Sequence, residues 1–388
     1  MNVSGVCKDF REGCADFGDH TFMNFAGLAP MPLSAVEAAT RAARAKAMPH
    51  AFEPGAFFNG VRTVRCHLAG LIGADPQDIA VTTGAGAGTA QVASSLDFKP
   101  GDEIVLVAQD FPSHDATWRP VADRYGASLK IADFDTPEQI PERLCELITP
   151  ATRLVSVSHV RFDDGSRLDV APVASACSRN GALLLLDVSQ SVGIVPLDVA
   201  DLDADFLVGV GYKYLMGPWG TGFLWISPEV SGDLRPAPWN WVAQNVNSFS
   251  DLSYVTPRPA RGAARFDAAQ TVGPFNINLA AWEASLCFLE RFPQGMALDH
   301  TQNLIDRLLE ALPPRCRRLT PTDRTARGAA GCFAAESSDA TADLYTFLIR
   351  KKFSISARNG RIRIAPHLLN REAEIDRLIK ALRQWASL

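Results

Sequence analysis

This 388-residue chain lacks several features that define other classes of protein. No apolar run reaches the roughly 18 residues of a membrane-spanning helix. Blocks of like charge are missing, and the net charge of −5 disfavours a surface that binds nucleic acid. The N-terminus has no apolar signal-peptide core. We therefore expect a cytoplasmic protein whose partners include neither membrane nor nucleic acid.

Cysteine is present, but not in patterns that carry structure. The eight cysteines are scattered, and no C-x-x-C pair occurs among them. This spacing disfavours a structural zinc site and a disulfide framework. We expect no metal ion, and we expect thiols that stay reduced.

What the chain does contain is a regular alternation of helix and strand. Short apolar strands are expected at residues 79–82, 103–107, 128–132, 154–157, 182–186, 206–208 and 222–226. Helical segments between them indicate an α/β fold with a mostly parallel sheet that is covered on both faces. We expect an N-terminal arm at 1–33 that joins the small domain, a large domain at 34–260 and a small α+β C-terminal domain at 261–388.

Polar residues follow the ends of several expected strands, where open parallel sheets bind their ligands. Lys213 lies between glycine turns after one strand, and Asp187 ends a leucine-rich strand that precedes it in the chain. A glycine-rich turn at 83–89 opens a helix, and free N–H groups at such a helix start suit a phosphate. Phe111 follows another strand and offers an aromatic face to a planar ring.

These residue types match the needs of pyridoxal phosphate. The amine of Lys213 would form a Schiff base with the cofactor aldehyde, and Asp187 would keep the pyridine nitrogen protonated. Gln190 or His159 would hydrogen-bond the phenol oxygen O3′. Lys213, once displaced by an amino acid, would move the α-proton. The chain is thus predicted to act on an α-amino acid through an external aldimine and a quinonoid carbanion.

Each of these residues also has an ordinary structural explanation. The glycine turn is compatible with a tight strand–helix connection, and Phe111 with simple packing. Asp187 can cap a turn, and Lys213 can be a solvated loop residue. His159 is more often a hydrogen-bonded core histidine than a catalytic one. The order and spacing of the whole set favour the cofactor site.

A nicotinamide-dependent dehydrogenase is the competing enzyme class. The glycine turn and Asp110, which follows the next strand and can bind a ribose, support it. The turn reads G-x-G-x-G, however, and not the G-x-G-x-x-G of dinucleotide sites. The dehydrogenase hypothesis also leaves Asp187 and Lys213 without a role.

At this point the sequence resembles the class V aminotransferase family of fold-type I pyridoxal phosphate enzymes, which includes cysteine desulfurases, kynureninases and isopenicillin N epimerase-like proteins. The resemblance covers about residues 24 to 370 in the family's order. It rests on Asn24–Gly27, Thr83–Gly86, Phe111–Ser113, Ser158–Val160, Asp187–Ser191, Gly211–Lys213 and Arg361–His367. It implies a seven-stranded sheet in the large domain and a homodimer.

The resemblance assigns cofactor roles residue by residue. Lys213 carries the cofactor, Asp187 pairs with the ring nitrogen, Gln190 lies near O3′, and Phe111 stacks on the ring. The other cofactor contacts that it implies are Ala85 and Gly86 at the phosphate, Tyr212 beside the lysine, and Gln270 or Thr271 lent to the phosphate by the partner subunit.

The resemblance also implies substrate contacts. Arg363 is the arginine that clamps the substrate α-carboxylate with a bidentate contact. Asn24 and Gly27 match the N-terminal segment on the substrate side. A histidine near the substrate, His114 or His159, would be a second acid in elimination or racemisation.

Three departures from the family pattern bear on the reaction. Tyr212 stands where many members have histidine, and Ala85-Gly86 replaces a frequent hydroxyl in the phosphate turn. The segment 354–360 has no cysteine, which disfavours a desulfurase that forms a protein persulfide, because Cys332 lies in an expected strand. Transamination, β- or γ-elimination and epimerisation stay open. A C–S or C–C lyase of the desulfurase or kynureninase type, without a persulfide cysteine, is the alternative.

Overall fold

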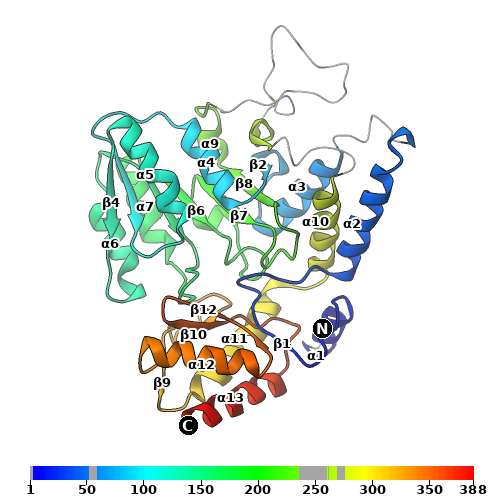
Figure 1. Ribbon diagram of the computed structural model, residues 1–388. Helices are drawn as coiled ribbons and strands as arrows, with labels where there is room; N and C mark the ends of the chain where they lie inside the picture. Colours follow the sequence, from blue (N-terminus) through cyan, green and yellow to red (C-terminus); the bar gives the residue numbers. More distant parts are fainter. Residues whose placement is uncertain (1–2, 52–58, 236–259, 261, 269–275) are drawn as a thin grey trace.

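The computed structural model describes residues 3–51, 59–235, 260, 262–268 and 276–388. Figure 1 shows a larger lobe above a smaller lobe that carries the C-terminus. A seven-stranded sheet forms the centre of the larger lobe. Its strands, in the order in which they lie side by side, are β2 (Ile79–Thr82), β8 (Gly222–Ile226), β7 (Phe206–Val210), β6 (Leu183–Asp187), β5 (Thr152–Ser158), β3 (Glu103–Val107) and β4 (Ser128–Ala132).

The large sheet is mostly parallel, as predicted. β8 runs antiparallel to β2 and β7, and the other neighbouring pairs are parallel. Side chains alternate between two apolar cores: Ile104 and Leu106 enter one, and Val105 and Val107 enter the other. The core of Val105 is covered by α3 (Asn59–Ile72), α6 (Ile140–Leu147), α7 (Val170–Asn180) and α10 (Ile277–Leu289), and the opposite core by α4 (Ala85–Ser95) and α5 (Ser113–Tyr125).

The small lobe is an α+β domain, again as predicted. Its antiparallel sheet has the order β12 (Ser356–Arg358), β13 (Arg361–Ile364), β10 (Gly331–Ala335) and β9 (Cys316–Arg318). Three helices complete the domain: α11 (Gln294–Glu310), α12 (Ser338–Arg350) and α13 (Glu372–Ala386). They close a third apolar core around Phe333 and Ile375.

The N-terminal arm is more ordered than the sequence suggested. It begins with α1 (Val3–Glu12), whose Phe10 is buried against Phe288 and Phe292. It continues with β1 (Thr21–Phe22), which pairs in parallel with β11 (Phe353–Ser354) of the small lobe. The arm thus runs beside the C-terminal domain before the chain enters the large one.

The packing of one long helix bears on where the domain boundary falls. α10 packs mainly against α2 (Leu33–Lys46) and α3, as Figure 1 shows. It begins after residue 260, so the sequence placed it in the small domain. We propose that the boundary falls after α10. Two short helices, α8 (Val199–Leu202) and α9 (Pro228–Ser231), complete the large lobe, and no described helix is long and apolar enough to cross a membrane.

Candidate active site

The ends of β5, β6 and β7 meet at one edge of the large sheet. Ser158 pairs with Asp187, and Asp187 pairs with Val208. Leu185 belongs to the core beneath α4 and α5, and side chains two residues apart on a strand share a face. Asp187 therefore points toward the face on which the glycine-rich turn opens α4. Lys213 follows β7 shortly beyond this edge.

Lys213 is a buried cation whose residue is only 7% exposed. It lies in a tight turn, in which the Met216 amide donates to the Lys213 carbonyl at 2.8 Å. Burial lowers the pKa of Lys213 to about 8; the Asp187 carboxylate opposes this, while the charges of Arg363 and Arg358 lower it further. Near neutral pH a usable fraction of the amine is therefore neutral, the form that acts as nucleophile and base.

Asp187 is held in place by the turn that follows it. Its Oδ1 accepts the Ser189 amide at 2.8 Å. The hydroxyl of Ser189 is buried and has no hydrogen-bond partner among the described residues. Buried polar groups in proteins almost always have partners, so an orphaned hydroxyl next to the buried acid Asp187 indicates a ligand position.

The glycine-rich turn leads into an uncapped helix. α4 begins at Ala85, and no side chain caps it. The Gly88 amide bonds to the Gly84 carbonyl, whereas the N–H groups of the first turn have no acceptor within the helix. β8 reaches this turn through Gly222, where a Cβ atom would lie 2.5 Å from the Cα of Gly84. The two glycines thus let the sheet support a helix start whose amides and positive dipole end suit a phosphate.

Phe111 provides an aromatic face beside the lysine. The Lys213 Nζ lies 5.5 Å from the centroid of the Phe111 ring. The edge-on ring of Phe162 supports it, with centroids 5.3 Å apart and planes at 87°. Phe111 is 36% exposed, which is high for a phenylalanine at the centre of a polar site. This exposure leaves a face of the ring free to stack on a ligand.

The N-terminal arm closes the site from another side. The Gln190 Nε2 donates to the Ala26 carbonyl at 3.0 Å, which leaves its second N–H for a ligand oxygen. Asn24 bridges to Ala365 of the small domain, and its buried Oδ1 has no partner among the described residues. A Cβ atom at Gly27 would lie 2.6 Å from that Oδ1, so a larger residue there would displace the Asn24 side chain.

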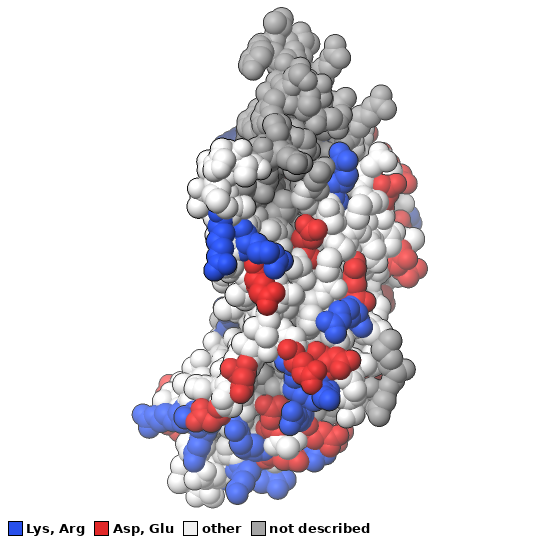
Figure 2. Space-filling model, turned by 90° about the vertical axis from the view of Figure 1, so that its right-hand side faces the viewer, with Lys and Arg blue, Asp and Glu red and all other residues white. Residues whose placement is uncertain are grey.

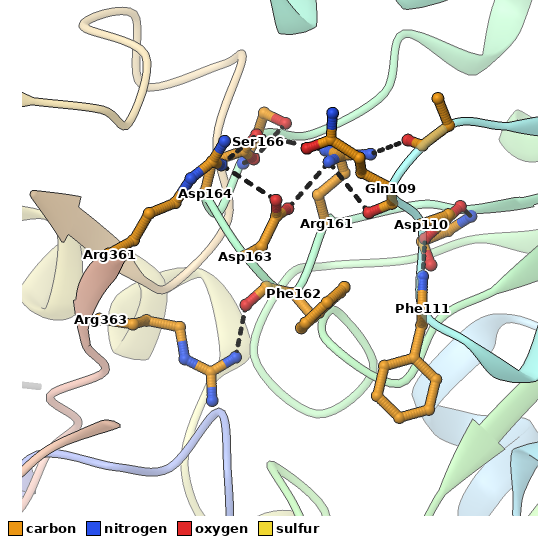
Figure 3. A network of polar contacts seen from close by, with 12 residues as sticks. Gln109, Asp110, Phe111, Arg161, Phe162, Asp163, Asp164, Ser166, Arg361 and Arg363 are labelled. Carbon is orange, nitrogen blue, oxygen red and sulfur yellow. Dashed lines mark hydrogen bonds and ion pairs between the residues drawn. The ribbon is translucent and has the colours of Figure 1, made fainter. Parts of the chain in front are cut away.

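Arg363 reaches the site from the small domain. It is buried on β13; its Nη1 donates to the Phe162 carbonyl at 2.6 Å and its Nε donates to Ser356 Oγ at 3.2 Å. No described residue accepts from its Nη2. Figure 3 shows Phe162 between Arg363 and Phe111, with its carbonyl turned to the arginine and its ring toward Phe111.

Tyr212, the neighbour of the lysine, is held by an aromatic stack. Its ring lies 3.8 Å from that of Trp219 at 18°, and its carbonyl accepts the Ala29 amide at 3.0 Å. Burial raises the pKa of Tyr212, and the Asp187 carboxylate raises it further. The phenol therefore stays neutral and adds no charge beside Lys213.

His159 does not have the surroundings of an acid–base catalyst. Val157 belongs to the core beneath α7, so strand alternation turns His159 to that face, away from the side chain of Asp187. Its Nε2 accepts from Arg167 Nε at 3.3 Å, and its Nδ1 lies 3.0 Å from Ser191 Oγ. Burial lowers the pKa of His159 to about 3. Because Nε2 accepts from Arg167, the neutral ring keeps its one N–H on Nδ1, beside Ser191 Oγ. Both nitrogens are thus engaged within the protein, and these contacts give no support to the expected catalytic role of His159.

His114 is likewise tied to the sheet. Its Nδ1 lies 2.7 Å from Ser156 Oγ and its Nε2 lies 3.4 Å from Ser158 Oγ. The ring is buried and makes no described hydrogen bond to Arg363. The expected substrate contact of His114 thus has no support in its hydrogen bonds. Gln270 and Thr271 lie outside the described residues.

Comparison with known proteins shows where this arrangement belongs. The sequence matches the family Aminotransferase class-V over residues 34–381, most of the chain. The chain belongs to the class V aminotransferases.

Individual relatives are similar over most of their length. An uncharacterized aminotransferase, YcbU, of Bacillus subtilis is 29% identical over 311 residues, 80% of each chain. Isopenicillin N epimerase of Streptomyces clavuligerus is 28% identical over 340 residues, 81% of this chain and 82% of its own. The cystine C–S lyase C-DES, solved with cysteine persulfide, has the same fold, with a TM-score of 0.85, 24% identity, and 94% of this chain and 97% of the other covered.

Pyridoxal phosphate is the cofactor of this family, and the site of this class V aminotransferase fits it. A buried lysine of lowered pKa, an acid, a free aromatic face and an uncapped helix start lie together. The orphaned Ser189 Oγ and Asn24 Oδ1 mark positions where the described part of the chain leaves polar atoms without partners. The family match also excludes the alternative hypothesis of a nicotinamide-dependent dehydrogenase.

Two residues at this site were missed by the sequence reasoning. Ser189 stands between Asp187 and Gln190, and only its orphaned hydroxyl distinguishes it from a turn residue. Phe162 lies in the loop after β5, and its importance comes from its contacts with Phe111 and Arg363. The one sequence signal that pointed to Phe162 was its place directly before the two acids Asp163 and Asp164.

Proposed function

We propose that this class V aminotransferase attaches pyridoxal phosphate at Lys213 and acts at the α- or β-carbon of an amino acid whose carboxylate is held by Arg363. The observation that carries the proposal is the buried Lys213 amine beside Asp187 and under Phe111, with a pKa lowered to about 8. When bound, pyridoxal phosphate supplies an electron sink for negative charge at the α-carbon.

The other residues take roles that follow from their positions. Asp187 presents a carboxylate that keeps a ring nitrogen protonated, and the amides of Ala85 and Gly86 receive the phosphate. Phe111 stacks on one face of the ring, and Gln190 turns its second N–H to the phenol oxygen. Lys213, when free, takes or returns the α-proton.

The substrate side is formed by the small domain and the arm. Arg363 offers its free Nη2 together with Nη1 to a carboxylate, a fork that matches the two oxygens. Asn24 presents its amide side chain beside Gly27, and the Oδ1 of that amide has no partner among the described residues. Holding the carboxylate fixes which bond at the α-carbon lies near Lys213, and this orientation chooses the bond that breaks.

Transamination, elimination and epimerisation are compatible with these residues, and a C–S or C–C lyase is the second candidate. A persulfide-forming desulfurase has less support. Cys332 is fully buried in β10, and burial raises its pKa to about 12, which keeps the thiol protonated. The segment 354–360 that precedes Arg363 has no cysteine.

The attachment site is tested by borohydride reduction. The full chain is loaded with pyridoxal phosphate, reduced and digested, and the modified peptide is identified by mass spectrometry. We expect the modification on Lys213. Modification at surface lysines alone, at the level seen in the unfolded protein, would reject the site. Screening amino acids for a spectral change, followed by identification of the products, then assigns the reaction.

We also propose that the chain forms a homodimer in a cytoplasmic, thiol-reduced setting. Leu33, Val36 and Ile277 lie on or beside the packed pair α2 and α10, and each is more than two-fifths exposed. Figure 2 shows charges of both signs scattered over the large-domain part of that side and a denser group of charges on the small domain. All eight cysteines are free. Sedimentation velocity tests the dimer, with Val36→Glu expected to shift it toward monomer; a wild-type monomer at all concentrations would reject it.

A further inference from the structure

The loop after β5 is a closed unit that lies between the two domains. It begins at Arg161, whose amide donates to the Ser166 carbonyl at 2.8 Å. Asp164 Oδ1 accepts from the amide and the hydroxyl of Ser166 at 2.9 and 2.6 Å. Ser166 also bridges to Arg327 of the small-domain chain. These bonds give the loop a defined shape, so the residues at its tip, Phe162 and Asp163, occupy fixed positions.

Two carboxylates of this loop are buried between two arginines. Arg161 Nη2 donates to Asp163 Oδ1 at 2.9 Å, and its Nε donates to Asp164 at 3.2 Å. Arg361 of the small domain donates to Asp163 Oδ2 at 2.9 Å. The Asp163 side chain is 0% exposed. A buried acid held by one arginine from each domain is a clasp across the domain interface, which Figure 3 shows from close by.

The clasp is connected to the cofactor side of the site. Arg161 donates to the carbonyls of Ala108 and Gln109 at 3.5 and 3.3 Å, directly before Asp110 and Phe111. Gln109 has a left-handed backbone, with φ of 56°, and needs such support. The strand end that presents Phe111 is therefore held by the same arginine that holds Asp163.

The clasp is also connected to the substrate side. Phe162 lies between Arg161 and Asp163; its carbonyl accepts from Arg363, and its ring supports Phe111. Arg361 and Arg363 are two residues apart on β13, so they share a face of the strand. Fixing Arg361 on Asp163 sets the position of Arg363 about 7 Å further along the same strand.

We propose that Asp163 is a positioning residue of this active site: by joining Arg361 to Arg161 it holds Phe162 in place and thereby sets the reach of Arg363 toward a substrate carboxylate. This inference rests on the proposed role of Arg363. An ion pair that only stabilises the fold is the rival explanation, and it predicts equal effects on every ligand.

The test compares two stable probes on the cofactor-free full-length chain. Pyridoxamine 5′-phosphate lacks a substrate carboxylate, and N-phosphopyridoxyl-glycine carries one. The dissociation constant of pyridoxamine 5′-phosphate divided by that of N-phosphopyridoxyl-glycine measures how much the carboxylate adds to binding. This ratio is obtained without any turnover. For Asp163→Asn and Arg361→Gln we expect this ratio to fall roughly tenfold, while the affinity for pyridoxamine phosphate stays within about twofold. Asp163→Glu, which keeps the charge, should restore part of the ratio.

A matched control comes from another buried acid. Asp267 pairs with Arg65 within the large domain and accepts the Val81 amide at 2.9 Å. Asp267→Asn should destabilise the protein without changing the ratio. Hydrogen exchange of the segment 353–364 gives a second readout, since loss of the clasp should speed exchange there and leave the strands of the large sheet unchanged.

The outcomes separate this inference from the function on which it rests. A ratio that stays at the wild-type value in Asp163→Asn and Arg361→Gln, with stability lost as in Asp267→Asn, would overturn the positioning role. If Asp163→Asn fails to fold, the half-buried Arg361→Gln decides alone. If the wild type bound N-phosphopyridoxyl-glycine no more tightly than pyridoxamine 5′-phosphate, the role of Arg363 itself would be overturned. A ratio that stays at the wild-type value in Arg363→Gln would overturn it as well.

Discussion

Two buried polar clusters lie side by side in this protein, and they differ in whether the protein satisfies them. Around Asp163, two acids and two arginines face each other with bonds near 3 Å, and each charge has a partner of opposite sign. Around Lys213, the amine has one acid nearby, and Ser189 Oγ and Asn24 Oδ1 have no hydrogen-bond partner among the described residues.

The difference distinguishes buried polar groups that hold the fold together from buried polar groups that bind a ligand. A saturated buried cluster fixes geometry, because removing one member leaves an uncompensated charge. An unsaturated one costs stability in the free protein and is tolerated where a ligand completes it. The clasp is thus the cluster that fixes the geometry. The cofactor site is the cluster whose polar groups lack partners until a ligand binds. Substitutions in the two clusters should therefore change different measurements.

Removing the amine should have the largest effect. Lys213→Ala should abolish covalent capture of pyridoxal phosphate and reduce turnover to background, because no other lysine of the described residues follows a strand end at this edge of the sheet. The fold should persist and gain stability, since a buried positive charge is lost. Borohydride trapping with mass spectrometry measures capture, and thermal unfolding measures stability. Capture at the wild-type level would show that another residue carries the cofactor.

The pH dependence of capture should follow the lowered pKa of Lys213. Only the neutral amine attacks a carbonyl, so protonation below about pH 8 should slow capture. The rate should rise about tenfold per pH unit up to that value and level off above it. A lysine in a short peptide is the control, because its rate should keep rising toward about pH 10.4. The same profile in both would show that burial does not tune this lysine.

Weakening the carboxylate clamp should have an intermediate effect. Arg363→Gln should raise the dissociation constant for amino acids by roughly tenfold to a hundredfold, given about 1.5–3 kcal/mol for hydrogen bonds to a charged group. Affinity for pyridoxal phosphate should change little, because Arg363 lies on the substrate side. Titrations of both ligands on the same preparation distinguish these results. Equal losses for both would mean that the substitution disturbs the whole site.

The contrast also shows what the sequence was able to predict. Strand ends in a parallel sheet converge, so Lys213, Asp187, Phe111 and the glycine turn were placed from order and spacing alone. His159 stays a prediction without such support, because alternation along β5 turns it to the opposite face. Val157, two residues before it in the chain, already indicated that face.

The clasp was out of reach for a different reason. Asp163 and Arg361 are 198 positions apart in the sequence. Charged residues are usually exposed to solvent, so nothing in the sequence marks these two as buried. Only the tertiary fold shows that these two are buried together. The packing of α10 against α2 and α3 was out of reach for the same reason, because its apolar surface does not say which helix it meets.

The smallest effect should come from removing, in separate variants, the hydroxyls of two nearby serines. One of these hydroxyls has hydrogen-bond partners in the protein and the other has none among the described residues. Ser191 Oγ donates to the Val188 carbonyl at 3.2 Å and contacts His159, whereas Ser189 Oγ has no described partner. Ser191→Ala should lower the free energy of unfolding by about 1 kcal/mol with unchanged cofactor affinity. Ser189→Ala should weaken pyridoxal phosphate binding by roughly twofold to tenfold and leave stability unchanged or higher, since it removes an unsatisfied group. Calorimetric unfolding and cofactor titration of both variants measure the two quantities. If Ser189→Ala lost stability as Ser191→Ala does, the hydroxyl of Ser189 would be bonded within the protein, and the distinction between the two clusters would fail at this residue.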